Sequence, residues 1–232
     1  MNLTIFGANG PTGRLLTQRA IDAGHHVVAV TRHPEAFPIQ HASLKVAGAD
    51  VHDRAAVTEA VRGSDAVLST LGVPYSRRPI TVYSEGAANI VAAMGELGVQ
   101  RLVVVSSSAA EPHIHADGGF MLNHVIQPLI VATIGKTMYA DMLRMEQLVR
   151  CTDLAWTVVR ASGLFDLPEA TAYRLDEEQA PGVHTARVDL AACMVDLLAD
   201  DRYVRKVVAV TTTAVKPSLW LLIWKEAFKK GT

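Results

Sequence analysis

Short runs of consecutive apolar residues, many of them β-branched, alternate along the chain with longer stretches in which apolar positions recur with helical spacing. This alternation is typical of βαβ units, and apolar residues on consecutive positions indicate strands that helices cover on both faces. The pattern predicts an α/β fold of Rossmann type, a doubly wound and mostly parallel sheet in a single domain. The expected strands are residues 3–6, 27–30, 44–47, 66–70, 102–105, 156–160 and 207–210. The expected helices are residues 13–23, 53–61, 82–97, 137–150 and 189–198.

Residues suited to capping stand at several of the expected helix ends. Gly24 and Gly98 follow two helices at positions where a left-handed C-terminal cap is wanted. Asp53 and Asp189 stand where a side chain is expected to cap the N-terminus of the next helix. The local sequence therefore supports the helix boundaries that the periodicity predicts.

One internal segment, near residues 111–136, departs from the alternation and is rich in proline and glycine. It leaves the fifth strand, and ligands of doubly wound sheets bind beyond the carboxyl ends of the strands. This insertion is therefore expected to border the substrate site. The alternative is a surface excursion with a short helix that packs on the protein through Phe120, Met121 and Leu122.

An apolar stretch near residues 217–229 predicts a C-terminal helix. It falls short of the roughly 20 apolar residues that cross a bilayer, so no transmembrane segment is expected. Packing on the core and contact with a second copy in a homodimer are the favoured interpretations, and contact with a membrane surface is the alternative. No internal repeat or low-complexity linker divides residues 1–232, which are expected to form one domain.

Charge and cysteine content narrow the choice of partner and compartment. The chain has 22 basic and 23 acidic residues and a net charge of −1. No global field attracts nucleic acid, so a small-molecule ligand is expected and nucleic acid is not. Two cysteines, and an N-terminus that opens directly into the first strand, favour a cytoplasmic location.

The first strand is followed at once by a turn of the pattern G-x-x-G-x-x-G. Gly7 is expected to allow the tight turn, Gly10 to let the backbone approach phosphate, and Gly13 to let helix and strand pack closely. The N–H groups and the positive dipole end of the next helix then face the phosphates. Such a turn between an apolar strand and an amphipathic helix predicts binding of a nicotinamide dinucleotide. The expected contacts are Gly7, Asn9, Gly10, Pro11, Thr12 and Gly13.

The end of the second strand distinguishes the two nicotinamide dinucleotides. An acidic residue there binds the ribose hydroxyls of NAD and repels the 2′-phosphate of NADP. Here Arg32 stands 19 residues after Gly13, close to the roughly 20-residue offset of that acidic residue, and a guanidinium binds phosphate bidentately. NADP(H) is therefore predicted in preference to NAD(H). The alternative is that Arg32 is a solvated surface charge, and Arg14 either assists it or faces water.

After the third strand, the short polar residue Asp50 is followed by the apolar residue Val51. Such a pair can flank the adenine of the cofactor. A plain turn residue at Asp50 explains the sequence equally well, so both interpretations stay open.

Together these motifs resemble the atypical short-chain dehydrogenases/reductases, in particular the NAD(P)H-binding group that includes biliverdin reductase B-type flavin reductases and NmrA-like proteins. The resemblance runs from residue 1 to about residue 200. It is carried by the glycine turn, by Thr31 and Arg32, and by residues 48–51, 84–91, 106–108, 139–146, 156–160 and 187–191.

The resemblance implies further contacts with the cofactor. One position departs from the family pattern, because a proline commonly follows the arginine of the segment 156–160 and this chain has alanine there. The implied contacts are Leu71 and Gly72 beside the cofactor, Ser106 and Ser107 near the nicotinamide, and Arg160, Ala161 and Leu164 past its carboxamide.

The catalytic residues typical of short-chain dehydrogenases are only partly present. Those enzymes use Tyr-x-x-x-Lys, in which the lysine lowers the pKa of the phenol. Tyr139 is followed four residues later by Leu143, and Arg144 is one position off the spacing. No cation therefore stands one helical turn beyond the phenol. Ser107 and Tyr139 are the candidate catalytic residues, as groups that hydrogen-bond an acceptor.

Other chemistries find little support in the residues. His113, His115 and His124 match no zinc spacing, so no metal is expected, and no G-x-S-x-G elbow of hydrolases occurs. The predicted function is an NADPH-dependent reductase of a small acceptor such as a flavin, quinone or carbonyl compound. The alternatives are a non-catalytic NADP(H)-binding sensor of NmrA-like type and, more narrowly, a sugar-nucleotide epimerase-like enzyme.

Overall fold

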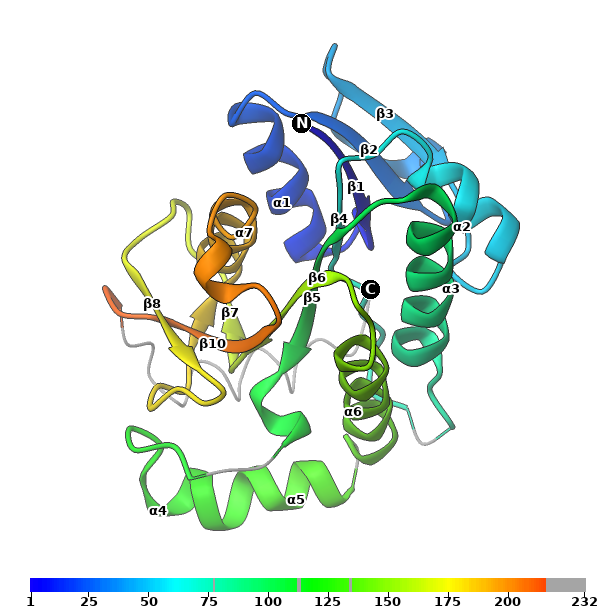
Figure 1. Ribbon diagram of the computed structural model, residues 1–232. Helices are drawn as coiled ribbons and strands as arrows, with labels where there is room; N and C mark the ends of the chain where they lie inside the picture. The colour runs from blue at the N-terminus through cyan, green and yellow to red at the C-terminus, as the bar shows by residue number, and fades with distance from the viewer. Residues whose placement is uncertain (77, 112–113, 134, 216–232) are drawn as a thin grey trace.

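Figure 1 shows the computed structural model, which describes residues 1–76, 78–111, 114–133 and 135–215. Its main sheet has eight strands in the order β3 (Leu44–Gly48), β2 (His26–Thr31), β1 (Asn2–Phe6), β4 (Ala66–Ser69), β5 (Arg101–Ser107), β6 (Ala155–Ala161), β10 (Lys206–Thr212) and β8 (Tyr173–Glu177). All neighbouring pairs are parallel except β10 and β8. The strand order reverses between β1 and β4, so their carboxyl ends form the switch point of a doubly wound sheet.

Helices cover both faces of this sheet (Figure 1). One face lies under α1 (Pro11–Asp22) and α7 (Arg187–Asp196), and the other under α2 (Arg54–Val61), α3 (Val82–Leu97) and α6 (Lys136–Arg150). On β4, Val67 and Leu68 belong to opposite core layers and both are fully buried. Consecutive strand positions are apolar because each face of the sheet has its own core.

The predicted Rossmann-type α/β fold is confirmed. All seven expected strands and all five expected helices are present, with ends within two residues of those predicted. The edge strand β8 was not predicted, because its charged side chains at Arg174 and Asp176 suit an exposed sheet edge and weaken the apolar signal. The remaining short elements are β7 (Leu164–Phe165), β9 (Thr185–Ala186) and the 3-10 turns η1 (Pro34–Ala36), η2 (Ser108–Ala110) and η4 (Asp201–Tyr203).

Three of the four predicted helix caps are confirmed. Gly24 and Gly98 have φ values of +80° and +73° directly after α1 and at the end of α3. Asp53 caps α2, because its Oδ1 atom accepts the N–H groups of Ala55 and Ala56 at 3.0 and 3.1 Å. These ends follow the local chemistry that the sequence displays.

The cap predicted at Asp189 is wrong. Helix α7 begins two residues earlier, with Ala186 in the N-cap position. The Asp189 carboxylate is fully buried and accepts hydrogen bonds from the N–H of Thr171 at 2.6 Å and from the hydroxyl of Thr212 at 2.6 Å. Its role is to tie the loop before β8 to the end of β10.

The insertion near residues 111–136 is largely helical. It contains α4 (Gly119–Met121), the π-helical turn η3 (Leu122–Ile126) and α5 (Gln127–Ala132), and it runs below the carboxyl end of β5 in Figure 1. The alternative prediction, that a short helix packs on the protein through Phe120 and Met121, is wrong, because these side chains are 71% and 60% exposed. Leu122 is half-buried.

The predicted C-terminal helix near residues 217–229 lies outside the described residues. Within the part of the chain that is described, no helix combines the length and apolarity that a membrane crossing needs.

Candidate functional site

The glycine turn fills the narrow space between the carboxyl ends of β1 and β4. Gly7 has a φ of +73°, a left-handed conformation that favours glycine. A Cβ atom at this position would lie 2.6 Å from the carbonyl oxygen of Thr70 and 2.9 Å from the nitrogen of Leu71. Thr70 is fixed there because its N–H donates to the carbonyl of Phe6 at 2.9 Å. Only glycine fits at position 7.

Gly13 lies where the first turn of α1 crosses the glycine turn. A Cβ atom there would lie 2.1 Å from the carbonyl oxygen of Gly7 and 2.8 Å from the backbone of Ala8. Gly10 is different, since among the described residues its Cβ would meet only the oxygen of Gly7, at 3.3 Å. The outer glycines bring strand and helix together, and the middle one leaves its backbone open to a ligand.

The N-terminus of α1 follows directly from this turn. Gly10 occupies the N-cap position, Pro11 opens the helix, Thr12 is half-buried, and no side-chain hydrogen bond from the described residues caps the end. Uncapped N–H groups and the positive end of the helix dipole suit a phosphate. The side chain of Asn9 is held by Arg14, whose Nε donates to Asn9 Oδ1 at 2.9 Å. A positive side chain therefore lies beside the turn.

The end of β2 lies next to the glycine turn. The N–H of Ala8 donates to the carbonyl of Val30 at 3.3 Å, and Arg32 follows as an exposed side chain. The pKa of the Asp50 carboxyl is lowered mainly by its hydrogen bonds with His52, and the positive charge of Arg32 adds to this effect. Thr31 at the end of β2 pairs with Gly48 at the end of β3, so Arg32 and Asp50 follow neighbouring strand ends.

Asp50 forms a turn, as one of its two interpretations predicted. Its Oδ1 atom accepts the N–H of His52 at 3.0 Å and lies 2.9 Å from His52 Nδ1. Val51 is 7% exposed, and its carbonyl accepts a hydrogen bond from the Asn89 side chain at 2.8 Å. A Cβ atom at Gly86 would lie 3.1 Å from Val51 Cγ2. The Val51 side chain therefore packs closely on α3.

Leu71 and Gly72 begin the loop between β4 and α3. The backbone of Leu71 contacts the glycine turn at Gly7. Further along, the carbonyl of Ser76 accepts a hydrogen bond from the hydroxyl of Thr137 in α6 at 2.7 Å. The loop thus connects the glycine turn with α6, the helix that carries Tyr139.

Strand β5 ends in two serines with different surroundings. Ser106 is 2% exposed, and its Oγ atom has no hydrogen-bond partner among the described residues. A buried hydroxyl without a partner costs free energy, so this atom suits a ligand group that would bond to it. Ser107 Oγ accepts the N–H of Ala109 at 3.2 Å and caps η2. The hydroxyl of Ser107 is thereby oriented by the backbone.

Tyr139 is held in place on α6 by a glycine and by a second tyrosine. It is 8% exposed, and a Cβ atom at Gly135 would lie 2.4 Å from its ring. Its hydroxyl oxygen lies 3.1 Å from the hydroxyl oxygen of Tyr75, and the two rings meet edge to face. Arg144 donates instead to Asp141 at 3.0 Å and to a carbonyl of the loop after β4. Sequence reasoning missed Tyr75, which stands in a loop without periodicity.

Arg160 is buried in a cluster of carboxylates. Its Nε and Nη2 atoms donate to the two carboxylate oxygens of Glu146 at 3.1 and 2.7 Å, and Nη2 also donates to Glu111 at 2.6 Å. Burial lowers the pKa of Arg160, but the hydrogen bonds and charges of Glu146 and then Glu111 outweigh it, so the net shift is upward. The guanidinium is therefore engaged within the protein, next to Ala161 at the end of β6.

The histidines considered for a metal site serve other contacts. His113 lies outside the described residues. The Nδ1 atom of His115 lies 3.2 Å from the carbonyl oxygen of Ala180, and the ring of His124 packs against that of Phe120 with centroids 4.7 Å apart. Among the described residues, no three potential metal ligands are grouped together.

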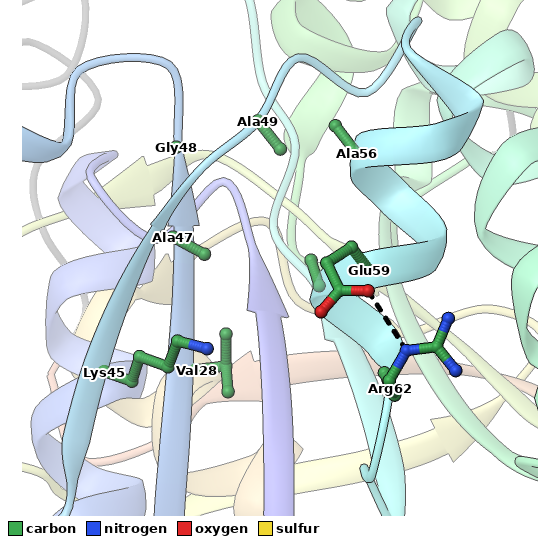
Figure 2. Close-up of a pocket in the computed structure, with 9 residues that line it drawn as sticks. Val28, Lys45, Ala47, Gly48, Ala49, Ala56, Glu59 and Arg62 are labelled. Atoms are coloured by element: carbon green, nitrogen blue, oxygen red, sulfur yellow. Dashed lines mark hydrogen bonds and ion pairs between the residues drawn. The ribbon is translucent and has the colours of Figure 1, made fainter.

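Figure 2 shows a cavity of about 150 Å³ near the β3 edge of the sheet, between β2, β3 and α2. Arg62 and Glu59 form an ion pair of 3.0 Å beside it. No predicted site residue lines this cavity, so it is separate from the glycine turn. Its lining consists of Val28, Lys45, Ala47, Gly48, Ala49, Ala56, Glu59, Ala60 and Arg62.

Comparisons with known proteins agree with this arrangement. An uncharacterised protein of Mycobacterium tuberculosis is 32% identical over 69% of the chain, and the match covers 20% of that protein. The chain thus spans about a fifth of the length of this relative. A protein of Emericella nidulans named as an oxidoreductase is 29% identical over 89% of the chain and 81% of its own length.

Solved structures show the same fold. A short-chain dehydrogenase/reductase from Veillonella parvula, crystallised in complex with NADP, superposes with a TM-score of 0.77 at 21% identity, over 94% of this chain and 99% of that one. The family described as NAD(P)H-binding matches residues 7–201, which includes the glycine turn and most of the sheet. The chain therefore belongs to the NAD(P)H-binding family.

Proposed function

We propose that this protein is an NADPH-dependent reductase that passes hydride to a small acceptor. The observation that carries the proposal is the glycine turn, in which two glycines lack room for a Cβ atom. The turn leads into the N-terminus of α1, which no described side chain caps. Membership of the NAD(P)H-binding family supports it. The similarity to a protein named as an oxidoreductase supports the assignment to redox chemistry.

The residues present fit a bound dinucleotide. The cradle at Gly7 and Gly13 lies at carboxyl ends of strands, where such ligands bind, and so does the Ser106 hydroxyl, which has no partner among the described residues. Arg160 would contribute its backbone, because Glu146 and Glu111 engage its guanidinium. In order from the adenine to the nicotinamide, we assign Arg32, Asp50, Val51, Gly7, Asn9, Gly10, Pro11, Thr12, Gly13, Leu71, Gly72, Ser106, Ser107, Arg160, Ala161 and Leu164.

NADP(H) is the proposed cofactor in preference to NAD(H). Arg32 is exposed at the end of β2, where the carboxylate that selects NAD would stand. A guanidinium there favours the dianionic 2′-phosphate by charge and by paired hydrogen bonds. The side chain of Arg14, beside the glycine turn, adds positive charge near the proposed phosphate site.

The bound cofactor supplies hydride, and the protein orients and polarises the acceptor. Ser107 and Tyr139 are the proposed hydrogen-bond donors to that acceptor. The insertion at residues 114–133 would form one wall of its site, and the exposed apolar side chains of Phe120 and Met121 suit a flat, apolar ligand such as a flavin, quinone or aromatic carbonyl compound.

The second candidate is a non-catalytic sensor of the NADP(H) state. The observation in its favour is Leu143, which stands where short-chain dehydrogenases have the lysine that activates the tyrosine. A sensor needs nucleotide binding and a protein partner but no proton donor. The two candidates therefore share the glycine turn and differ at α6.

The test is a titration of NADPH and NADH into purified protein, followed by oxidation assays with flavin, quinone and carbonyl acceptors. Tight binding of NADPH with turnover supports the reductase. Tight binding without turnover on all three acceptor classes favours the sensor. Binding of neither nucleotide would overturn both candidates.

A further inference from the structure

Two phenols from separate parts of the chain meet at the proposed acceptor site. Tyr75 comes from the loop after β4 and Tyr139 from α6, and their hydroxyl oxygens lie 3.1 Å apart. The ring centroids are 6.4 Å apart and the ring planes are inclined by 70°. We propose that Tyr75 positions and reprotonates Tyr139, and so replaces the lysine that this chain lacks. The inference rests on the proposed reductase function and narrows its acceptor to a carbonyl compound.

The two rings differ in exposure, and this difference sets the direction of proton transfer in the proposed relay. Tyr139 is 8% exposed and Tyr75 is 39% exposed, so in the proposed relay the outer phenol exchanges protons with water and the inner phenol with the acceptor. A hydroxyl both donates and accepts a hydrogen bond, so Tyr139 can donate to an acceptor while it accepts from Tyr75. Two linked phenols form a path along which a proton moves from solvent to the buried oxygen.

The surrounding structure holds both phenols in position. The ring of Tyr139 lies against Gly135, where a Cβ atom would approach to 2.4 Å. The loop that carries Tyr75 is fastened to α6 by the hydrogen bond from Thr137 to the carbonyl of Ser76, at 2.7 Å. The contact between the phenols is therefore part of a rigid junction between the loop and the helix.

A second anchor fastens the next part of the chain to the same helix. Asp141 accepts the N–H groups of Tyr83 and Ser84 at the start of α3, at 2.9 and 3.3 Å. Asp141 also accepts the hydroxyl of Ser84 and is paired with Arg144. The loop is thus held at both ends.

Three titratable groups near the pair, Tyr83, Asp141 and Glu146, are bonded to other residues. The Tyr83 hydroxyl accepts the N–H of Val73 at 3.3 Å, and its pKa is raised, mainly by burial. On α6, Asp141 bonds to the start of α3 and to Arg144, as described. Glu146 is bonded to Arg160 of β6. The loop and α6 also carry Arg78 and Lys136.

The proposed reaction balances with a carbonyl acceptor. The carbonyl carbon accepts a hydride, with its two electrons, from the reduced nicotinamide, which is oxidised. The carbonyl oxygen takes the hydroxyl proton of Tyr139, so the product is an alcohol. Tyr139 then takes the proton of Tyr75, and water reprotonates Tyr75. One proton is drawn from solvent in each turnover, and neither tyrosine is consumed.

Three variants test this relay. Tyr139→Phe should lower kcat for a carbonyl acceptor by at least about 100-fold, the usual contribution of a general acid. Tyr75→Phe should lower kcat roughly tenfold, as expected for one hydrogen bond to the reacting group. Tyr173→Phe is the matched control, because it removes a phenol hydroxyl that donates to Asp196 at 2.6 Å and packs in the other core layer, away from Tyr75 and Tyr139.

The pH profile separates a relay from a loss of structure. The proton donor must be protonated, so kcat falls as pH rises through the pKa of Tyr139. A hydrogen bond from Tyr75 stabilises the Tyr139 phenolate and lowers that pKa. Tyr75→Phe should therefore move the alkaline limb of the profile to higher pH by about one unit, the equivalent of one hydrogen bond. Tyr173→Phe should keep the profile of the wild-type protein.

A titration without cofactor or acceptor gives an independent result. The ultraviolet absorbance of tyrosinate, compared between wild type and Tyr139→Phe, isolates the ionisation of Tyr139. The same comparison between Tyr75→Phe and the double variant Tyr75→Phe/Tyr139→Phe should show that ionisation at higher pH. An unmoved ionisation would overturn the relay.

The outcomes keep this inference distinct from the proposed function. If wild-type protein oxidises NADPH with carbonyl acceptors and Tyr75→Phe retains its rate and pH profile, the relay is wrong and the reductase stands. If wild-type protein binds NADPH and reduces only flavin or quinone, the carbonyl relay is also wrong. Absence of turnover with every acceptor would overturn the reductase and the relay together.

Discussion

Arg160 of β6 and Glu146 of α6 form a two-point ion pair in which each side chain is only 1% exposed. The pair joins the centre of the sheet to the helix that carries Tyr139. Glu111 adds a second carboxylate at the start of the insertion, but its side chain is 54% exposed. The geometry of the proposed acceptor site therefore depends on a buried charge and its partner.

Glu146→Gln leaves the buried guanidinium without its main counter-charge. We expect the free energy of unfolding to fall by about 3–5 kcal/mol, the usual cost of breaking a buried pair from one side. Urea denaturation followed by circular dichroism measures this. Glu111→Gln is the control, and because its side chain is half-exposed the loss should be about 1 kcal/mol or less. Equal losses in the two variants would show that burial does not set the strength of this pair.

Gly13→Ala places a methyl group where the carbonyl oxygen of Gly7 stands, 2.1 Å away. The backbone must move to relieve this overlap, so we expect both a lower melting temperature and weaker binding of NADPH. Gly95→Ala in α3 is the control, because among the described residues nothing lies within 4 Å of the added atom. That variant should be stabilised by about 0.5–1 kcal/mol. Normal NADPH binding by Gly13→Ala would contradict the proposed role of the glycine turn.

The fold was predictable because its signals are local and repeated. The central strands of the sheet bury both faces, as Val67 and Leu68 of β4 do, so they appear in the sequence as continuous apolar runs. The glycine turn is also contained in seven consecutive residues.

The parts that sequence reasoning missed depend on partners far apart in the chain. An aspartate before an apolar run looks like a helix cap, but Asp189 is bonded to Thr171 and Thr212, which no local pattern identifies. Tyr75 and Tyr139 are 64 residues apart and meet only because the loop after β4 crosses α6. Contacts between residues far apart in the chain position most of the candidate site beyond the glycine turn.

The two cysteines should differ sharply in reactivity. Cys193 is fully buried in α7, and burial raises the pKa of its thiol well above the usual range. Cys151 is exposed at the end of α6. We expect a thiol reagent near neutral pH to modify one cysteine in the native protein and two after denaturation, with Cys151→Ser abolishing the native reaction. Rapid modification of both thiols in the folded protein would contradict the burial of Cys193.

Arg32→Ala tests the proposed choice of cofactor. The guanidinium can bond to the 2′-phosphate of NADPH and has no such partner in NADH, so its removal should weaken the two nucleotides unequally. Loss of a charge-assisted hydrogen bond corresponds to roughly a 10- to 100-fold rise in the Kd for NADPH. The Kd for NADH should change less than about threefold. Fluorescence titrations of both nucleotides at low and high salt measure the difference, which should shrink as salt screens the exposed charge.

Arg62→Ala is the control, since that arginine lies beside the separate cavity at α2 and should leave both affinities unchanged. Equal weakening of NADPH and NADH by Arg32→Ala would show that Arg32 supports the fold of this edge and does not select the cofactor.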